Sequence, residues 1–100
     1  MSFDELNPLL HSQLRLAIMS LLISVKEADF SFIKKKTEAT SGNISVQISK
    51  LEDAGYLEVT KSFINKRPNT SYTVTDKGIN AFEEYVNTLE QYLDISNPSK

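Results

Sequence analysis

The sequence contains no cysteine and only one histidine, His11. Without cysteine there is no disulfide framework, no thiolate metal site, no redox-sensing thiol and no cysteine nucleophile. A single histidine also excludes paired-histidine metal motifs and leaves most general-base schemes without their usual residue. His11 is open to two interpretations, a pH sensor or a hydrogen-bonded residue at a helix start, and the second is simpler. We therefore expect no metal and no other cofactor.

Glycine is scarce as well, with three residues, which leaves little for a phosphate-binding loop. An enzyme would need several titratable groups gathered in a pocket, and the sequence offers no candidate set, so it predicts a protein without catalytic residues. No apolar run is long enough to span a membrane. Residues 1–5 are acidic and lack the basic and apolar regions of a signal peptide, so the expected location is the cytoplasm.

The net charge of −2 is small, but the charges are unevenly distributed. Residues 34–77 carry eight basic and five acidic side chains, a net of +3, and the rest of the chain carries a net of −5. This distribution suits a chain whose middle faces phosphate and whose ends serve another purpose. Within the basic segment, Lys34, Lys35 and Lys36 either touch a phosphate backbone or form an ordinary solvated face.

Apolar residues at helical spacing predict an amphipathic helix over roughly residues 9–25, with Pro8 at its start. A second apolar stripe, formed by Leu9, Leu16 and Ile23, recurs every seven residues. A helix that is apolar on more than one face has more than one neighbour. The second neighbour is either another part of the same chain or a second subunit.

The next segment predicts two shorter helices joined by a turn. Residues 26–29 are expected to be a polar connection, and Ser31 is expected to cap a short helix. After a turn at residues 37–40, Thr40 or Ser41 can cap a third helix over 41–54. Gly55 ends it, because glycine readily adopts the left-handed conformation.

After Gly55 the apolar period changes from helical to alternating, which predicts a β-hairpin. The strands are expected at residues 57–63 and 71–75, and the turn cluster 65–69 gives the hairpin a basic tip. Pro68 is expected to stiffen this turn. Thr75 can then cap a last helix over roughly residues 76–94.

The last helix carries an apolar heptad seam. Its far end extends beyond a compact domain, so we expect it to meet a second subunit. Residues 96–100 are expected to be a frayed tail. The predicted subunit contact consists of Leu9, Leu16, Ile23, Tyr85, Val86, Leu89, Tyr92 and Leu93.

Together these elements predict a mainly α chain with a small β-hairpin (α+β), arranged as a winged helix-turn-helix. We expect one domain over residues 1–100, with the helix-turn-helix and wing at 8–75 and the dimerisation helix at 76–95.

Asparagine and glutamine can pair bidentately with adenine, and lysine can contact guanine or phosphate. The candidate DNA contacts of the third helix are Ser41, Asn43, Ser45, Val46, Gln47, Ser49 and Lys50. Those of the wing, at about residues 64–71, are Lys66, Arg67, Asn69 and Thr70.

Residues 11–83 resemble the single-domain winged-helix regulators of the MarR/ArsR-like superfamily. The resemblance is carried by residues 11–18, 30–33, 42–45, 66–72 and 74–78, and most clearly by 50–57, where the third helix meets the first strand. Metal-sensing members use cysteines or histidine clusters, which this sequence lacks. The turn at 37–40 also lacks the glycine and the large aliphatic residue often found there.

The resemblance implies a homodimer joined through the first and last helices. It also implies third helices in successive major grooves, on half-sites about one helical turn apart. The predicted function is sequence-specific binding of double-stranded DNA as a homodimeric transcriptional regulator. The alternative is a winged-helix module that binds protein instead of DNA. The sequence does not indicate an effector, an operator or the sign of regulation.

Overall fold

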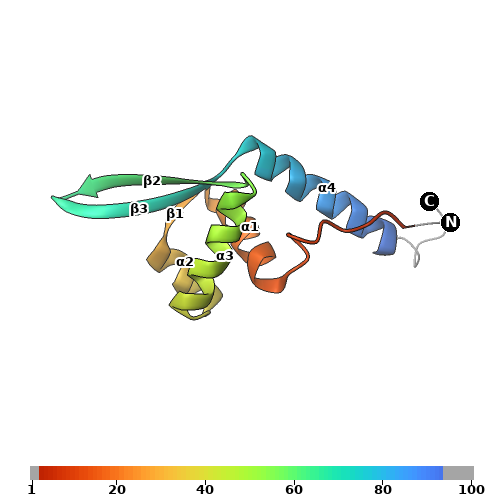
Figure 1. Cartoon of the computed structure of the whole chain (residues 1–100), viewed down its shortest axis with the longest axis horizontal. Helices are drawn as coiled ribbons and strands as arrows, with labels where there is room; N and C mark the ends of the chain where they lie inside the picture. The colour runs from red at the N-terminus through yellow and green to blue at the C-terminus, as the bar shows by residue number, and fades with distance from the viewer. Residues whose placement is uncertain (1–2, 94–100) are drawn as a thin grey trace.

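The computed structural model describes residues 3–93, which form four helices and a three-stranded antiparallel sheet (Figure 1). The elements follow in the order α1 (Gln13–Val25), β1 (Glu27–Asp29), α2 (Phe30–Thr37), α3 (Ser41–Asp53), β2 (Leu57–Ile64), β3 (Arg67–Val74) and α4 (Asp76–Leu93). This confirms the predicted α+β winged-helix class. The predicted helix end at 94–95 and the predicted tail at 96–100 lie outside the described residues.

The first helix begins later than predicted, at Gln13 instead of residue 9. The preceding residues 8–10 form a separate turn, in which Asn7 Oδ1 accepts hydrogen bonds from the backbone N–H of Leu9 and Leu10. Pro8 therefore starts this turn and not α1. The turn buries Leu10 completely in the core cluster that also contains Ile18 of α1, so the chain is already packed on the core before the long helix begins.

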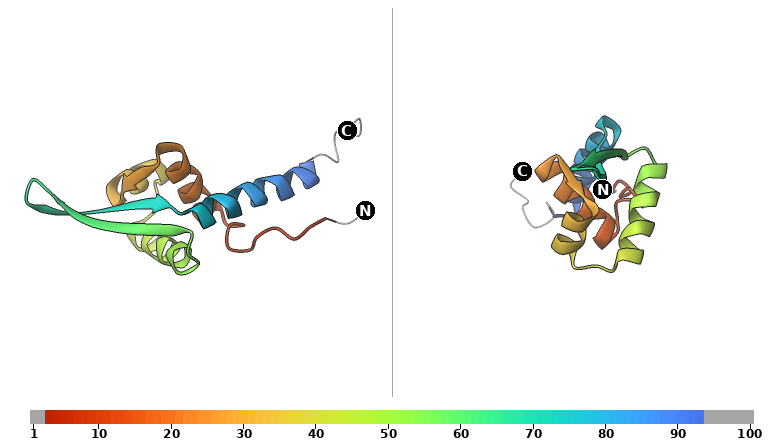
Figure 2. Two further views of the ribbon diagram at one scale, coloured as in Figure 1. Left: turned by 90° about the horizontal axis from the view of Figure 1, so that it is seen from above. Right: turned by 90° about the vertical axis from the view of Figure 1, so that its left-hand side faces the viewer.

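The helix-turn-helix is formed by α2 and α3, which lie across α1 (Figures 1 and 2). Asp29 caps α2 by accepting from the N–H of Phe32, so the expectation that Ser31 would be the cap is wrong. Thr40 caps α3 as predicted, with its Oγ1 accepting from the N–H of Asn43. Between the helices Glu38 has a φ of 58°, the left-handed conformation in which glycine is usually found.

The sheet has the order β1–β3–β2, so it contains a strand that the sequence did not reveal. Residues 26–29 were expected to be a polar connection, but Glu27–Asp29 pair with Ser71–Thr73 of β3. The pairing buries Ala28 against the core and leaves its two neighbours exposed. Because it joins positions more than forty residues apart, β1 ties the start of α2 to the base of the wing.

The hairpin turn is shorter than predicted. It consists of Asn65 and Lys66 alone, with φ angles of 54° and 64°. Two positive φ values are characteristic of the two-residue turn whose twist matches that of the flanking strands. Pro68, expected to lie in the turn, belongs to β3 opposite Phe63. The strands are eight residues each, and the hairpin projects well beyond the helices (Figures 1 and 2).

At the opposite end, α4 extends away from the core, and residues 3–7 run alongside it (Figures 1 and 2). The ring of Phe3 stacks on that of Tyr92 with centroids 4.7 Å apart, and Asp4 hydrogen-bonds to Gln91. The hydroxyl of Tyr92 donates to the Asp4 carbonyl at 2.7 Å. We call residues 3–7 the N-terminal arm. With the wing at one end and α4 at the other, the molecule measures 58 × 26 × 21 Å.

Candidate nucleic-acid interface

Helix α3 has one face in the core and one face in solvent. Ile44, Ile48 and Leu51 are buried, as their four-then-three spacing predicts. Val46 is 51% exposed among polar side chains, where its methyl groups are accessible to the methyl group of a thymine. Six of the predicted DNA contacts lie exposed on the solvent face of α3, namely Ser41, Asn43, Ser45, Val46, Ser49 and Lys50.

Gln47 differs from the other predicted contacts because it is half-buried and hydrogen-bonded on both sides. Its Oε1 accepts from Arg15 Nη1, and its Nε2 donates to Asn43 Oδ1 at 2.9 Å. Arg15 is itself fixed by a 2.6 Å hydrogen bond from Nε to the carbonyl of Leu9. A chain of contacts thus runs from the turn before α1 to two predicted base-reading side chains. Sequence reasoning did not find Arg15, because its role depends on how α1 packs against α3.

The wing carries its predicted contacts on the hairpin that follows α3. Lys66 lies in the turn, and Arg67 is the first residue of β3; both are exposed. Asn69 and Thr70 are half-buried in the same strand. Lys61 lies opposite Thr70 on β2, so it shares one face of the hairpin with Thr70 and with the Val59–Tyr72 pair.

A groove of about 350 Å³ separates α3 from this face of the hairpin. Its walls supply hydroxyl groups from Ser45, Ser49 and Thr70 together with the ammonium of Lys61, groups that commonly bind phosphate oxygens. Burial, together with the nearby Glu52 carboxylate, raises the pKa of Tyr72, which also lines the groove. A tyrosine phenol is protonated at neutral pH in any case, and the raised pKa keeps Tyr72 protonated further into the alkaline range. Lys61 and Tyr72 were not among the predicted site residues, although the alternation of the strands places both on the face of Val59.

The comparisons with known proteins agree with this geometry. A family model described as a winged helix DNA-binding domain matches residues 14–93. The chain belongs to this family. An uncharacterised protein of Methanocaldococcus jannaschii is 35% identical over 81 residues, which cover 81% of this chain and 88% of that protein.

The fold of this winged-helix protein is similar to that of solved transcriptional regulators. A transcriptional regulator homologue from Pyrococcus horikoshii is 31% identical, with a TM-score of 0.81 over 89% of this chain and 88% of its own. A mutant of MarR from E. coli complexed with operator DNA has a TM-score of 0.73 at 17% identity. That match covers 86% of this chain and 61% of the MarR chain. The predicted resemblance to MarR-like winged-helix regulators is confirmed at the level of the fold.

The predicted subunit contact of this winged-helix protein divides into two groups. Tyr85 and Tyr92 serve the chain's own packing: Tyr85 is buried with its hydroxyl 2.9 Å from His11 Nδ1, and Tyr92 contacts the N-terminal arm. Val86 and Leu93 are 38% and 61% exposed, one heptad apart on a different face of α4. The remaining predicted residues are half-buried, namely Leu9, Leu16, Ile23 and Leu89.

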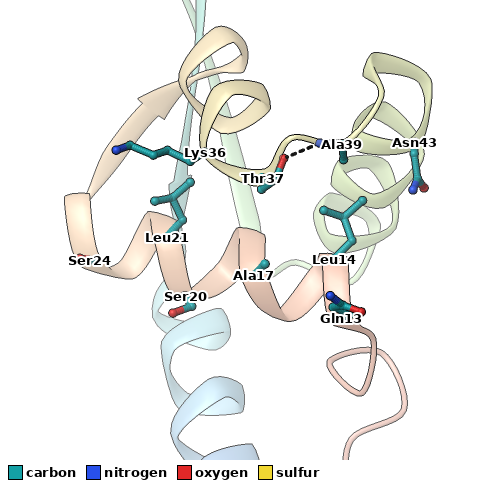
Figure 3. Close-up of a pocket in the computed structure, with 10 residues that line it drawn as sticks. All are labelled: Gln13, Leu14, Ala17, Ser20, Leu21, Ser24, Lys36, Thr37, Ala39 and Asn43. Carbon is teal, nitrogen blue, oxygen red and sulfur yellow. Dashed lines mark hydrogen bonds between the residues drawn. The ribbon is translucent and has the colours of Figure 1, made fainter.

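A second hollow, of about 660 Å³, lies over α1 beside the turn between α2 and α3 (Figure 3). Leu14, Ala17 and Leu21 of α1 face Lys36 and other residues of the helix-turn-helix across it. The hollow is open to solvent. Lys36 is the one charged residue among the described residues that line it, and the others are small, aliphatic or carry a hydroxyl or amide group. Lys34 and Lys35 are exposed on the same short helix.

Within residues 3–93, no three histidine, aspartate or glutamate side chains come close enough together to hold a metal ion. No helix in this part of the chain is long and apolar enough to cross a membrane.

Proposed function

We propose that this winged-helix protein is a homodimeric transcriptional regulator that binds a specific sequence in double-stranded DNA. In this proposal α3 enters the major groove, and Asn43, Gln47 and Lys50 meet base edges there. The β2–β3 hairpin lies on the adjacent backbone or minor groove, where Lys66 and Arg67 neutralise phosphates. The finding that carries the proposal is the family match, because it covers both the helix-turn-helix and the wing.

The geometry supports the same assignment through the groove between α3 and the hairpin. A DNA backbone that passes from the major to the minor groove would follow this groove, with hydroxyl donors on both sides and Lys61 at its wall. Glu52 is the one acidic residue that lines it. Its carboxylate limits how closely a phosphate approaches that end of the groove.

The test is a fluorescence-anisotropy titration at several salt concentrations, with a duplex recovered by random-sequence selection and a scrambled control. We expect tighter binding to the selected duplex and an affinity that falls linearly with salt on logarithmic axes. Gln47→Ala should reduce the preference for the selected duplex, whereas Arg67→Ala should weaken both duplexes and lower the salt slope by about one. The proposal fails if no duplex binds even at low salt, and binding of a protein partner then becomes the leading function.

A further inference from the structure

The tip of the wing is apolar as well as basic. Phe63 is 76% exposed and Ile64 is 55% exposed, the first of them the most exposed large apolar side chain in the described part of the chain. Pro68, which pairs with Phe63, is exposed as well, and adjoining exposed apolar side chains mark binding sites more often than single ones do. The Phe63 ring also cannot pack on the core of its own chain, because the end of the hairpin stands clear of the helices in Figure 1 and in the left view of Figure 2.

Pro68 lies directly opposite Phe63 in the strand register. In an antiparallel ladder every second pair has no hydrogen bonds between its members, and proline, which has no N–H, fits such a pair without cost. Side chains approach each other most closely at these pairs. Phe63 and Pro68 therefore form one rigid apolar ridge across the hairpin, which we call the wing ridge.

The ridge faces the same way as the groove described above. Pairs two residues apart share a face, so Val59–Tyr72, Lys61–Thr70 and the wing ridge follow one another along one side of the hairpin. At a rise of about 3.3 Å per residue, Phe63 lies about 13 Å beyond Val59. Major and minor grooves are about 17 Å apart along B-DNA, half of a helical turn, so a hairpin beside α3 brings the ridge to the neighbouring minor groove.

The charges around the ridge match a DNA partner and not an apolar protein surface. Between residues 59 and 75 the sequence has three basic side chains, Lys61, Lys66 and Arg67, and no acidic one. They lie on both sides of Phe63 along the hairpin. An apolar residue flanked by cations is the arrangement of minor-groove wedges, in which the cations hold the phosphates and the apolar group enters between base pairs.

We propose that the wing ridge is a DNA wedge: the Phe63 ring, backed by Pro68, enters the minor groove beside the site bound by α3 and partly unstacks one base step. Lys61, on the same face as Phe63, and Lys66, in the turn, hold the phosphates on either side of that step. The bend that follows brings more of the duplex against the protein. This inference rests on the proposed DNA-binding function and adds a contact made by shape and apolar surface instead of charge.

The test compares wild type, Phe63→Ala, Phe63→Leu and the control Ile64→Ala on the selected duplex. Ile64 neighbours Phe63 in sequence but points to the opposite face of the hairpin. We expect Phe63→Ala to weaken binding about tenfold or more without changing the salt slope, because a wedge releases no counterions. Phe63→Leu should retain most of the affinity. Because Phe63 is exposed, the thermal unfolding midpoint should not change.

A second readout observes the base step itself. The selected duplex is prepared with 2-aminopurine at successive positions flanking the α3 site, and with a donor and acceptor dye at its ends. Wild type should raise 2-aminopurine fluorescence at one step and shorten the end-to-end distance, and Phe63→Ala should do neither. If wild type binds this duplex but Phe63→Ala binds equally well with an unchanged bend, the wedge is wrong and the DNA-binding function stands. If Phe63→Ala instead abolishes self-association in sedimentation, the ridge is a protein contact.

Discussion

Gln47 shows how the fold can prepare a single side chain for recognition. A free glutamine on a helix surface samples several rotamers and loses that freedom on binding. Here Arg15 holds its carbonyl oxygen, and Asn43 receives one of its amide hydrogens. The second amide hydrogen of Gln47 and the amide nitrogen of Asn43 then remain available, in a fixed orientation, for base edges in the proposed major-groove contact. Arg15 would thus be a positioning residue for base contacts that it does not make.

Replacement of Arg15 tests this role. Arg15→Ala should lower the ratio of affinities for the selected and scrambled duplexes about tenfold, a loss of about 1.4 kcal/mol of discrimination, because Gln47 then loses its fixed orientation. The two anisotropy titrations measure this ratio directly. Lys26→Ala is the matched control, because Lys26 is an exposed cation at the other end of α1. If both variants lose affinity equally for the two duplexes, Arg15 contributes only charge.

At the scale of elements, the junction of α4 with the sheet depends on the absence of a side chain at Gly78. A Cβ at this position would lie 2.4 Å from the Tyr56 carbonyl oxygen and 2.8 Å from Val74 Cγ1. Thr75 caps the helix at the same place, accepting from the Gly78 N–H and donating to the Gly55 carbonyl. The start of α4 is therefore fixed against both the end of α3 and the wing.

Gly78→Ala should destabilise the protein by about 1–3 kcal/mol, the usual cost of overpacking a rigid site. Gly42→Ala is the control, because a Cβ there meets nothing within 4 Å. Alanine in α3 should be neutral or stabilise by up to about 1 kcal/mol through helix propensity. Urea unfolding curves measure both values. Equal effects at the two positions would contradict the tight junction.

The elements also show what the sequence could predict. Helices α3 and α4 and both wing strands follow from apolar period and capping residues, because those signals lie within a few residues of each other. Strand β1 has only three residues, too few for an alternation to be recognised, and it forms because β3 lies beside it. The N-terminal arm and Arg15 depend on contacts between distant residues, such as Asp4 with Gln91. The exposed side of α3 could be listed from the sequence, but the groove that joins it to the wing could not.

The whole molecule is electrically polarised along its length. The basic segment 34–77 contains most of the helix-turn-helix and the whole wing, while the arm and the rest of α4 carry Asp4, Glu5, Glu83, Glu84 and Glu90. Such a charge distribution turns the wing and α3 toward a polyanion and directs α4 away from it. This leaves α4 with its partly exposed apolar residues Ile79 and Val86 as the surface on which a second copy would pack.

Dimer formation through α4 is tested by Val86→Glu. A charge in the centre of an apolar subunit contact should raise the dimer dissociation constant at least about tenfold, because the carboxylate loses its hydration on association. Sedimentation velocity over a range of protein concentrations measures this change. Asn87→Glu adds the same charge about 100° round the helix, away from the apolar stripe, and should have little effect. A monomeric wild type would contradict the dimer.

The most direct test of the proposed arrangement of the dimer on DNA is a hydroxyl-radical footprint of the wild-type protein on the selected duplex. A dimer with α3 in successive major grooves should protect two half-sites about one helical turn apart, related by two-fold symmetry. Each wing should add a patch of protection in the flanking minor groove, and Phe63→Ala should lose only these outer patches. A single asymmetric patch, or no protection where the anisotropy shows binding, would contradict the proposed arrangement on DNA.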